Sequence, residues 1–216
     1  MWLLPEKNQY VFFHPFRCFI AGPTFSGKSK LIEKIVLNRD KIIDKKIEKI
    51  FICYKTPNNS YDLFKYMDID VEMNEGLLDF NELDTKKNNL VILDDLMSVC
   101  KDSNEVLNLF TVDSHHRNIS VFLVSQNLYT QGKCAREISL NASNLVIFKN
   151  PRDKTQVSIL ARQMFPQKTK AFLEAYYDCT LKEYGYIHLD LNPNTPENLR
   201  IQTNITESSR IIYTLN

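Results

Sequence analysis

A short glycine-containing segment limits the folds open to this chain more than any other feature of its sequence. The segment, Gly22-Pro-Thr-Phe-Ser-Gly-Lys-Ser29, follows an apolar run at residues 16–21 and opens a stretch, residues 29–38, whose apolar residues recur at helical spacing. The two glycines let the backbone turn back on itself, so that successive N–H groups point inward at an anion. The N-terminus of a helix adds positive potential at the same point. The order of strand, loop and helix therefore predicts a phosphate-binding loop in an α/β fold.

Residues of this loop have different roles in holding a nucleotide. Lys28 can reach the β- and γ-phosphates of ATP, which makes it a candidate catalytic residue, and the hydroxyl of Ser29 can ligate Mg²⁺. ATP and Mg²⁺ are accordingly the expected cofactors, and the alternative interpretation is an ordinary glycine turn. The residues expected to contact the nucleotide are Gly22, Pro23, Thr24, Phe25, Ser26, Gly27, Lys28, Ser29 and Lys30.

Short apolar runs alternate with longer amphipathic stretches along most of the chain. Runs of strand length that are apolar on both faces are typical of a buried parallel sheet. Such runs lie at residues 16–21, 47–54, 90–93, 119–125 and 145–148, with a late strand at 184–189. Helical patterns lie at residues 29–38, from Ser103 to Phe110, and at 155–164 and 169–177. The alternation predicts an α/β fold in which a mostly parallel central sheet is flanked by helices.

The domain organisation follows from the absence of linker composition. The chain has only five glycines in 216 residues, and no Ser/Gly-rich or Pro-rich stretch interrupts it. We therefore expect one ATPase domain over residues 1–191. From residue 192 onward the sequence is polar, and residues 192–216 are expected to form an extended arm or tail.

Charge and cysteine content exclude several classes of protein. The formal net charge is +1, so any contact with DNA must come from local patches or from one face of an oligomer. The five cysteines are scattered, which argues against a disulfide framework or a zinc site and favours a reducing, intracellular location. The first apolar stretch is too short for a signal peptide, and no run approaches the ~20 residues that span a bilayer. No membrane partner is expected.

Two acids follow the apolar run at residues 90–93. Strands of a parallel sheet present their carboxyl ends to a ligand, so acids at this position face the phosphates. Asp94 is expected to hold Mg²⁺, and Asp95 is the candidate general base that polarises the attacking water. The alternative for both residues is a solvated strand end followed by a turn.

Gln126 and Arg117 lie at the two ends of the run at residues 119–125. A Gln at a strand end beside Asp94 can bind both the γ-phosphate and the attacking water, and the alternative is an ordinary polar turn. Arg117 can act as an arginine finger in the ATP site of a neighbouring subunit, where a fixed cation stabilises transition-state charge. The alternative for Arg117 is an exposed residue that caps the C-terminus of a helix.

The chain resembles, over nearly its whole length, the FtsK–HerA type genome-packaging ATPases of double-stranded DNA viruses. The likeness is greatest to the poxvirus-type branch that occurs in Polinton (Maverick) elements, adintoviruses and related viruses. The matching segments are GPTFSGKS, FICYKTPN, LVILDDLM, DSHHRNISVFLVSQNLY, SLNASNLVIFKNPRD, LARQMFP and LDLNPNTPENLRIQTNI.

This resemblance implies a RecA-like core of the ASCE type, with the Gln126 strand between the Gly22 and Asp94 strands. It also implies a homo-oligomeric ring, a pentamer or hexamer, that pumps double-stranded DNA into a preformed capsid within the infected host cell. Proteins of the capsid or portal vertex would be partners, and the ATPase would also be found with the virion. Gln126 would be the sensor and Arg117 the finger, with Arg136 and Arg152 as rivals; Asp95 stands where the family commonly has Glu.

Other nucleotide-dependent functions remain as alternatives. A GTPase needs an Asn-Lys-x-Asp base reader, and residues 149–152, Lys-Asn-Pro-Arg, have the reverse order. A small-molecule kinase usually carries an Arg-rich lid, whereas the Arg residues here are dispersed. A cellular-type DNA translocase and a subunit that uses nucleotide only to assemble are also compatible with the motifs. Residues 149–152 either contact adenine, line a DNA pore with Lys133, or form a turn with solvated charges.

Overall fold

The predicted apolar runs form the interior strands of one sheet. The computed structural model describes residues 10–56 and 59–215. The strands that correspond to the predicted runs are β1 (Arg17–Ala21), β2 (Lys49–Tyr54), β4 (Asn89–Asp94), β5 (Ile119–Ser125), β6 (Asn144–Phe148) and β7 (Tyr186–Asp190). The sequence did not predict β3 (Asp70–Glu75), β8 (Ile201–Thr203) and β9 (Ile211–Tyr213).

The loop and the two acids lie at the same end of the sheet, where the parallel strands have their carboxyl ends. Within the described residues the sheet has nine strands in the order β3-β2-β4-β5-β1-β6-β7-β8-β9. The strands from β3 to β6 in this order run parallel, and β7, β8 and β9 are added antiparallel. The strand that precedes Gln126 lies between the Gly22 and Asp94 strands, as the resemblance implies. The expected fold class, a mostly parallel sheet flanked by helices, is confirmed.

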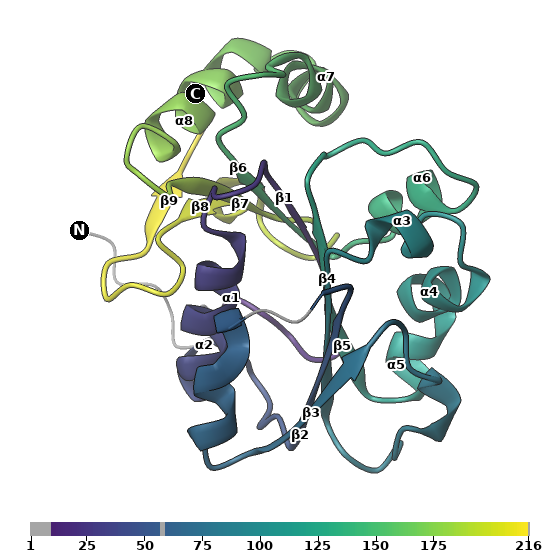
Figure 1. Ribbon diagram of the computed structural model, residues 1–216. Helices are drawn as coiled ribbons and strands as arrows, with labels where there is room; N and C mark the ends of the chain where they lie inside the picture. The colour runs from purple at the N-terminus through teal and green to yellow at the C-terminus, as the bar shows by residue number, and fades with distance from the viewer. Residues whose placement is uncertain (1–9, 57–58, 216) are drawn as a thin grey trace.

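Helices cover both faces of the sheet because successive strand side chains point to opposite sides. Phe19 packs with Val106 and Phe110, whereas the next residue, Ile20, packs with helix residues on the other face. One face carries α1 (Lys28–Leu37), α2 (Arg39–Ile42) and the 3₁₀ segment η2 (Asn59–Tyr66). The other carries η3 (Phe80–Glu82), α3 (Met97–Cys100), α4 (Asn104–Asn108), η4 (Leu109–Asp113), α5 (Ser114–His116), α6 (Ala135–Leu140), α7 (Thr155–Met164) and α8 (Thr169–Cys179). Figure 1 shows α1 and α2 on one side of the sheet and α3 to α6 on the other.

The predicted helices begin close to where the structure has them. Ser103 caps α4, since its hydroxyl accepts a hydrogen bond from the Val106 N–H at 3.2 Å. The helix predicted at residues 155–164 is α7, and the one predicted at 169–177 is α8, which continues to Cys179. No helix in the described part of the chain is both long and apolar enough to cross a bilayer.

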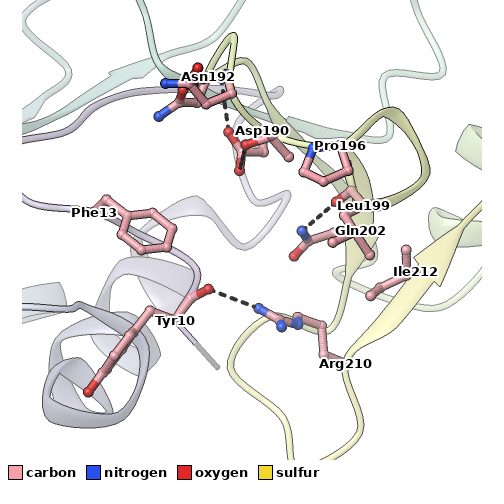
Figure 2. Close-up of a pocket in the computed structure, with 11 residues that line it drawn as sticks. Tyr10, Phe13, Asp190, Asn192, Pro196, Leu199, Gln202, Arg210 and Ile212 are labelled. Carbon is pink, nitrogen blue, oxygen red and sulfur yellow. Dashed lines mark hydrogen bonds between the residues drawn. The ribbon is translucent and has the colours of Figure 1, made fainter. Parts of the chain in front are cut away.

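The C-terminal segment folds onto the sheet, whereas the sequence predicts an extended arm at residues 192–216. After the short η5 (Glu197–Leu199), β8 pairs with β7 and β9 pairs with β8. Two residues of the segment, Ile201 and Ile205, are almost fully buried and attach it to the core. The polar composition of the segment gave no sign of this burial. Arg210 also links the segment to the first described residue, because it donates a hydrogen bond to the Tyr10 carbonyl at 3.3 Å (Figure 2). Both outer limits of the predicted domain and tail, together with two residues of the FICYKTPN segment, lie outside the described residues.

Candidate functional site

The chain passes from β1 to α1 through the glycine-containing loop. The Gly22 N–H donates to the Ser125 carbonyl at 3.2 Å, so the first residue of the loop still pairs with β5. The loop then closes a turn, in which the Ser26 N–H donates to the Pro23 carbonyl at 3.2 Å. The Gly27 carbonyl accepts the N–H of Leu31 at 2.9 Å, the first hydrogen bond of α1. The predicted order of strand, loop and helix is therefore present.

Both glycines of the loop are required by their surroundings. A Cβ on Gly22 would lie 2.7 Å from the Cβ of Phe148 and 2.7 Å from the Oγ of Ser26, which is closer than carbon and oxygen atoms approach without a bond. Gly27 has φ +102°, in the left-handed region that glycine favours, and a Cβ there would lie 3.0 Å from the Tyr184 ring. A larger residue at either position would therefore distort the loop.

Lys28 lies folded over the loop that precedes it. Its Nζ donates to the Gly22 carbonyl at 2.6 Å and to the Pro23 carbonyl at 2.8 Å. Burial lowers the pKa of Lys28, while the negative charges of Asp94 and Asp95 raise it. The ammonium group of Lys28 therefore lies close enough to both carboxylates to interact with them electrostatically.

Asp94 and Asp95 differ in their surroundings although they are adjacent in the chain. Asp94 ends β4 and is 7% exposed, and it accepts a hydrogen bond from the Tyr61 hydroxyl at 2.7 Å. Burial raises the pKa of Asp94, and this rise is opposed by the Tyr61 hydrogen bond and the Lys28 charge. Asp95 is exposed and has φ +55°, which turns the chain sharply at the strand end. The buried acid suits a fixed ligand role, and the exposed one can reach a substrate.

Tyr61 is a residue of this site that the sequence did not reveal. Its side chain is 1% exposed, and its hydroxyl donates to Asp94. The Ser29 side chain also lies near enough to Tyr61 to lower its pKa, against the larger effect of burial, so Tyr61 lies close to both residues that were predicted to hold Mg²⁺. Nothing in the sequence separates it from Tyr66 of the same η2 segment, which is 87% exposed. Only the packing of η2 against α1 and the sheet shows which tyrosine faces Asp94.

We expect Tyr61→Phe to weaken the Mg²⁺-dependent binding of nucleotide. The change removes the hydroxyl that holds one carboxylate oxygen of Asp94, and loss of such an outer-shell partner typically lowers metal affinity roughly tenfold or more. The measurement is nucleotide affinity titrated against Mg²⁺ concentration. Tyr66→Phe, an exposed change on the same segment, is the matched control. An unchanged Mg²⁺ dependence in Tyr61→Phe would show that Asp94 does not depend on this contact.

One open groove, of about 1230 Å³, runs along the carboxyl ends of the parallel strands. The predicted residues that line it are Thr24, Phe25, Ser26, Gly27, Lys28, Ser29, Lys30, Asp94, Asp95 and Gln126. Gly22 and Pro23 contribute their carbonyls to Lys28 beneath this surface. Gln126 is exposed at the end of β5, beside the Asp94 strand, and Lys30 pairs with Glu33 at 2.8 Å.

The groove also contains cations that the sequence analysis did not assign. Lys55 follows β2 at the same sheet edge, because Tyr54 at the end of β2 pairs with Asp94. Lys101, just after α3, lines the groove as well. The position of Lys55 was readable from the sequence, since it directly follows a predicted strand, as Asp94 and Gln126 do.

Arg117 does not lie at the groove. It precedes β5, whereas Gln126 follows it, and a strand of this seven-residue length spans roughly 20 Å. Its guanidinium instead contacts Asp113 at 3.4 Å and donates to the Phe80 carbonyl at 3.3 Å. The predicted role of Arg117 in the site of a neighbouring subunit stays a prediction. Its rivals, Arg136 on α6 and Arg152 after β6, are both exposed.

A second cavity, of about 270 Å³, lies away from the loop between the C-terminal strands and the start of the described chain. Figure 2 shows Phe13 on one side of this cavity and Gln202 and Arg210 on the other. The Gln202 amide donates to the Leu199 carbonyl at 2.7 Å. None of the predicted site residues lines this cavity, so the groove along the strand ends is the candidate functional site.

The donors at the loop fit Mg²⁺. Among the described residues no group of three or more His, Cys, Asp or Glu side chains is placed to hold a metal ion. Mg²⁺ commonly takes one or two protein oxygen ligands and completes its shell with phosphate oxygens and water. The Ser29 hydroxyl and the Asp94 carboxylate, both close to Tyr61, are such a pair of oxygen ligands.

Comparison with known proteins identifies the fold. No protein-family model matches the chain, and no curated protein sequence matches it. Among solved structures, the genome packaging NTPase B204 from Sulfolobus turreted icosahedral virus 2, in complex with ATP-gammaS, is similar with a TM-score of 0.57 and 18% identity, over 87% of this chain and 95% of that chain. B204 of Sulfolobus turreted icosahedral virus, described as a DNA-packaging ATPase, has a TM-score of 0.58 and 17% identity over 88% and 96% of the two chains. The α/β sheet flanked by helices is thus the fold that this chain shares with the B204 structures.

Proposed function

We propose that this chain is an ATP-hydrolysing motor that moves double-stranded viral DNA into a preformed capsid. The observation that carries the proposal is the juxtaposition of Lys28 with Asp94 and Asp95 at one sheet edge. A single cation in a loop of inward-facing amides binds a polyphosphate, and carboxylates opposite it manage the metal and the water.

The loop is built to exchange its internal contacts for those of ATP. The Lys28 ammonium, which now donates to two loop carbonyls, would donate to β- and γ-phosphate oxygens instead. Ser29 and Asp94 would hold Mg²⁺, which supplies neutralising charge to the phosphates when bound. Asp95, exposed in the groove, would accept the proton of the attacking water, and Gln126 would orient that water against the γ-phosphate.

The DNA-packaging part of the proposal is supported by the fold comparison and by the resemblance in sequence. B204, whose structure covers nearly the same extent of chain, is described as a genome packaging NTPase. The position of Arg117, roughly a strand length from its own groove, agrees with a role in the site of a neighbouring copy. We therefore propose a pentameric or hexameric ring that contacts double-stranded DNA and the capsid or portal vertex in the infected cell or the virion.

Steady-state ATP turnover with and without double-stranded DNA tests the motor directly. We expect turnover by the purified chain in the absence of any small-molecule acceptor, a several-fold rise with long duplex DNA, and an assembly mass of five or six chains. ATP turnover at the same rate with and without DNA would favour another P-loop NTPase. Nucleotide-dependent assembly without ATP turnover would favour an assembly subunit. DNA translocation that does not require a capsid would favour a cellular-type translocase.

A further inference from the structure

Two exposed aromatic side chains flank the phosphate loop. The Phe25 side chain is 94% exposed and that of Tyr184 is 59% exposed. Between them lies a side pocket of about 430 Å³, to which Lys149 and Leu181 also contribute. Phe25, Ser26 and Tyr184 line both this side pocket and the groove, so the two spaces adjoin at these residues.

The side pocket and the acids lie on opposite sides of the loop. In the sheet, β1 has β5 and then β4 on one side, and β6 and then β7 on the other. Asp94 ends β4, whereas Lys149 follows β6 and Tyr184 precedes β7. A molecule that crosses the loop with one end near Asp94 therefore has its other end at the side pocket.

The ring of Tyr184 is held over the loop at an energetic cost. A Cβ on Gly27 would lie 3.0 Å from Cδ1 and 3.3 Å from Cγ of Tyr184, so this ring covers the start of α1. Tyr184 has φ +57°, a conformation unfavourable for a residue with a side chain. The next residue, Gly185, has no room for a Cβ, which would lie 2.3 Å from the Cys179 carbonyl oxygen. Strain of this kind in an exposed aromatic residue is more common at ligand sites than elsewhere.

We propose that the side pocket between Phe25 and Tyr184 is the nucleobase subsite, with the base stacked on the Tyr184 ring. This inference rests on the proposed binding of ATP, because the triphosphate fixes where the base can lie. With the terminal phosphate near Asp94 and Asp95, the base reaches the opposite side of the loop, where both aromatic rings are exposed. An aromatic ring stacks on the face of any base, so Tyr184 contributes affinity for nucleotides over inorganic polyphosphates.

The test compares ATP with inorganic tripolyphosphate, each with Mg²⁺, as ligands of the full chain. In Tyr184→Ala we expect the Kd for ATP to rise roughly tenfold, the usual scale for loss of one base–aromatic stack, while the Kd for tripolyphosphate is unchanged. Tyr184→Phe retains the ring and is expected to bind ATP as the wild type does. Tyr177→Ala, which removes a 46% exposed tyrosine from α8, is the control and should change neither affinity.

The three contrary outcomes are distinguishable. Equal ATP affinity in Tyr184→Ala and the wild type would overturn the stacking role while leaving the phosphate site intact. Equal losses for ATP and tripolyphosphate would also overturn it, because the ring would then support the loop and not the base. A wild-type chain that binds neither ligand would overturn the proposed function, and the base subsite with it.

Discussion

We expect Lys28→Ala to abolish ATP turnover while the chain remains folded. Removal of one preorganised charge-stabilising donor commonly lowers kcat by at least about a hundredfold, and Lys28 is the cation that lies on the loop itself. The fold is expected to persist because the two hydrogen bonds of Nζ to the loop are only partly buried, so their loss should cost about 1–3 kcal/mol, less than the stability of a typical domain. Phosphate release measures turnover, and thermal unfolding measures stability.

The matched control for this prediction is Lys34→Ala. Lys34 lies on the same helix, is exposed, and pairs with Glu207 at 2.9 Å away from the groove. It should keep wild-type turnover. Wild-type rates in Lys28→Ala would refute the assignment of the phosphate site, and unfolding of that variant would mean that the fold depends on the two hydrogen bonds of Nζ to the loop.

The second large effect is expected from Asp95→Asn, which should bind ATP and fail to hydrolyse it. Asn has the same shape as Asp and also tolerates positive φ, so the turn at φ +55° should survive. The amide cannot accept the proton of the attacking water, and loss of a general base typically costs about 10²–10⁴ in rate. Binding should persist because Lys28 and Ser29 are untouched.

Calorimetric ATP binding and turnover, measured on the same preparation, check this prediction. Asp40→Asn, an exposed change on α2, controls for the loss of one negative charge. Unchanged turnover in Asp95→Asn would remove Asp95 from the mechanism. Loss of ATP binding would instead mean that Asp95 takes part in holding the metal, a role that the sequence analysis gives to Asp94.

The parts of the fold that were predictable are those with a local signal. The strand from Ile119 to Ser125 is apolar on both faces, and such a run can lie only inside a sheet covered on both sides. By contrast, β3 is an edge strand that pairs with β2 alone among the described residues, and only Val71 and Met73 of its six residues are apolar. The strands β8 and β9 are three residues each, too short to show a period.

The residues of the candidate site were likewise predictable only where the sequence carries a local signal. Strand ends are visible in the sequence, so the sequence alone is enough to place Asp94 and Gln126 at the same edge of the sheet. Tyr61 could not be placed in this way, because its bond to Asp94 joins residues 33 apart in the chain and depends on how η2 packs. Tyr184 was hidden for a related reason: its left-handed backbone and its contact with Gly27 arise only when β7 lies two strands from β1.

The placement of Arg117 and the groove at opposite ends of β5 has a consequence for how copies of the chain can meet. If one copy offers Arg117 to the nucleotide of another, the amino edge of the first sheet must face the carboxyl edge of the second. When every copy repeats this contact in the same head-to-tail sense, the contact is heterologous and builds a ring if the rotation between copies closes. Each copy then has a donor face and an acceptor face, and hydrolysis at one contact has a defined next neighbour, which gives the assembly a sense of rotation.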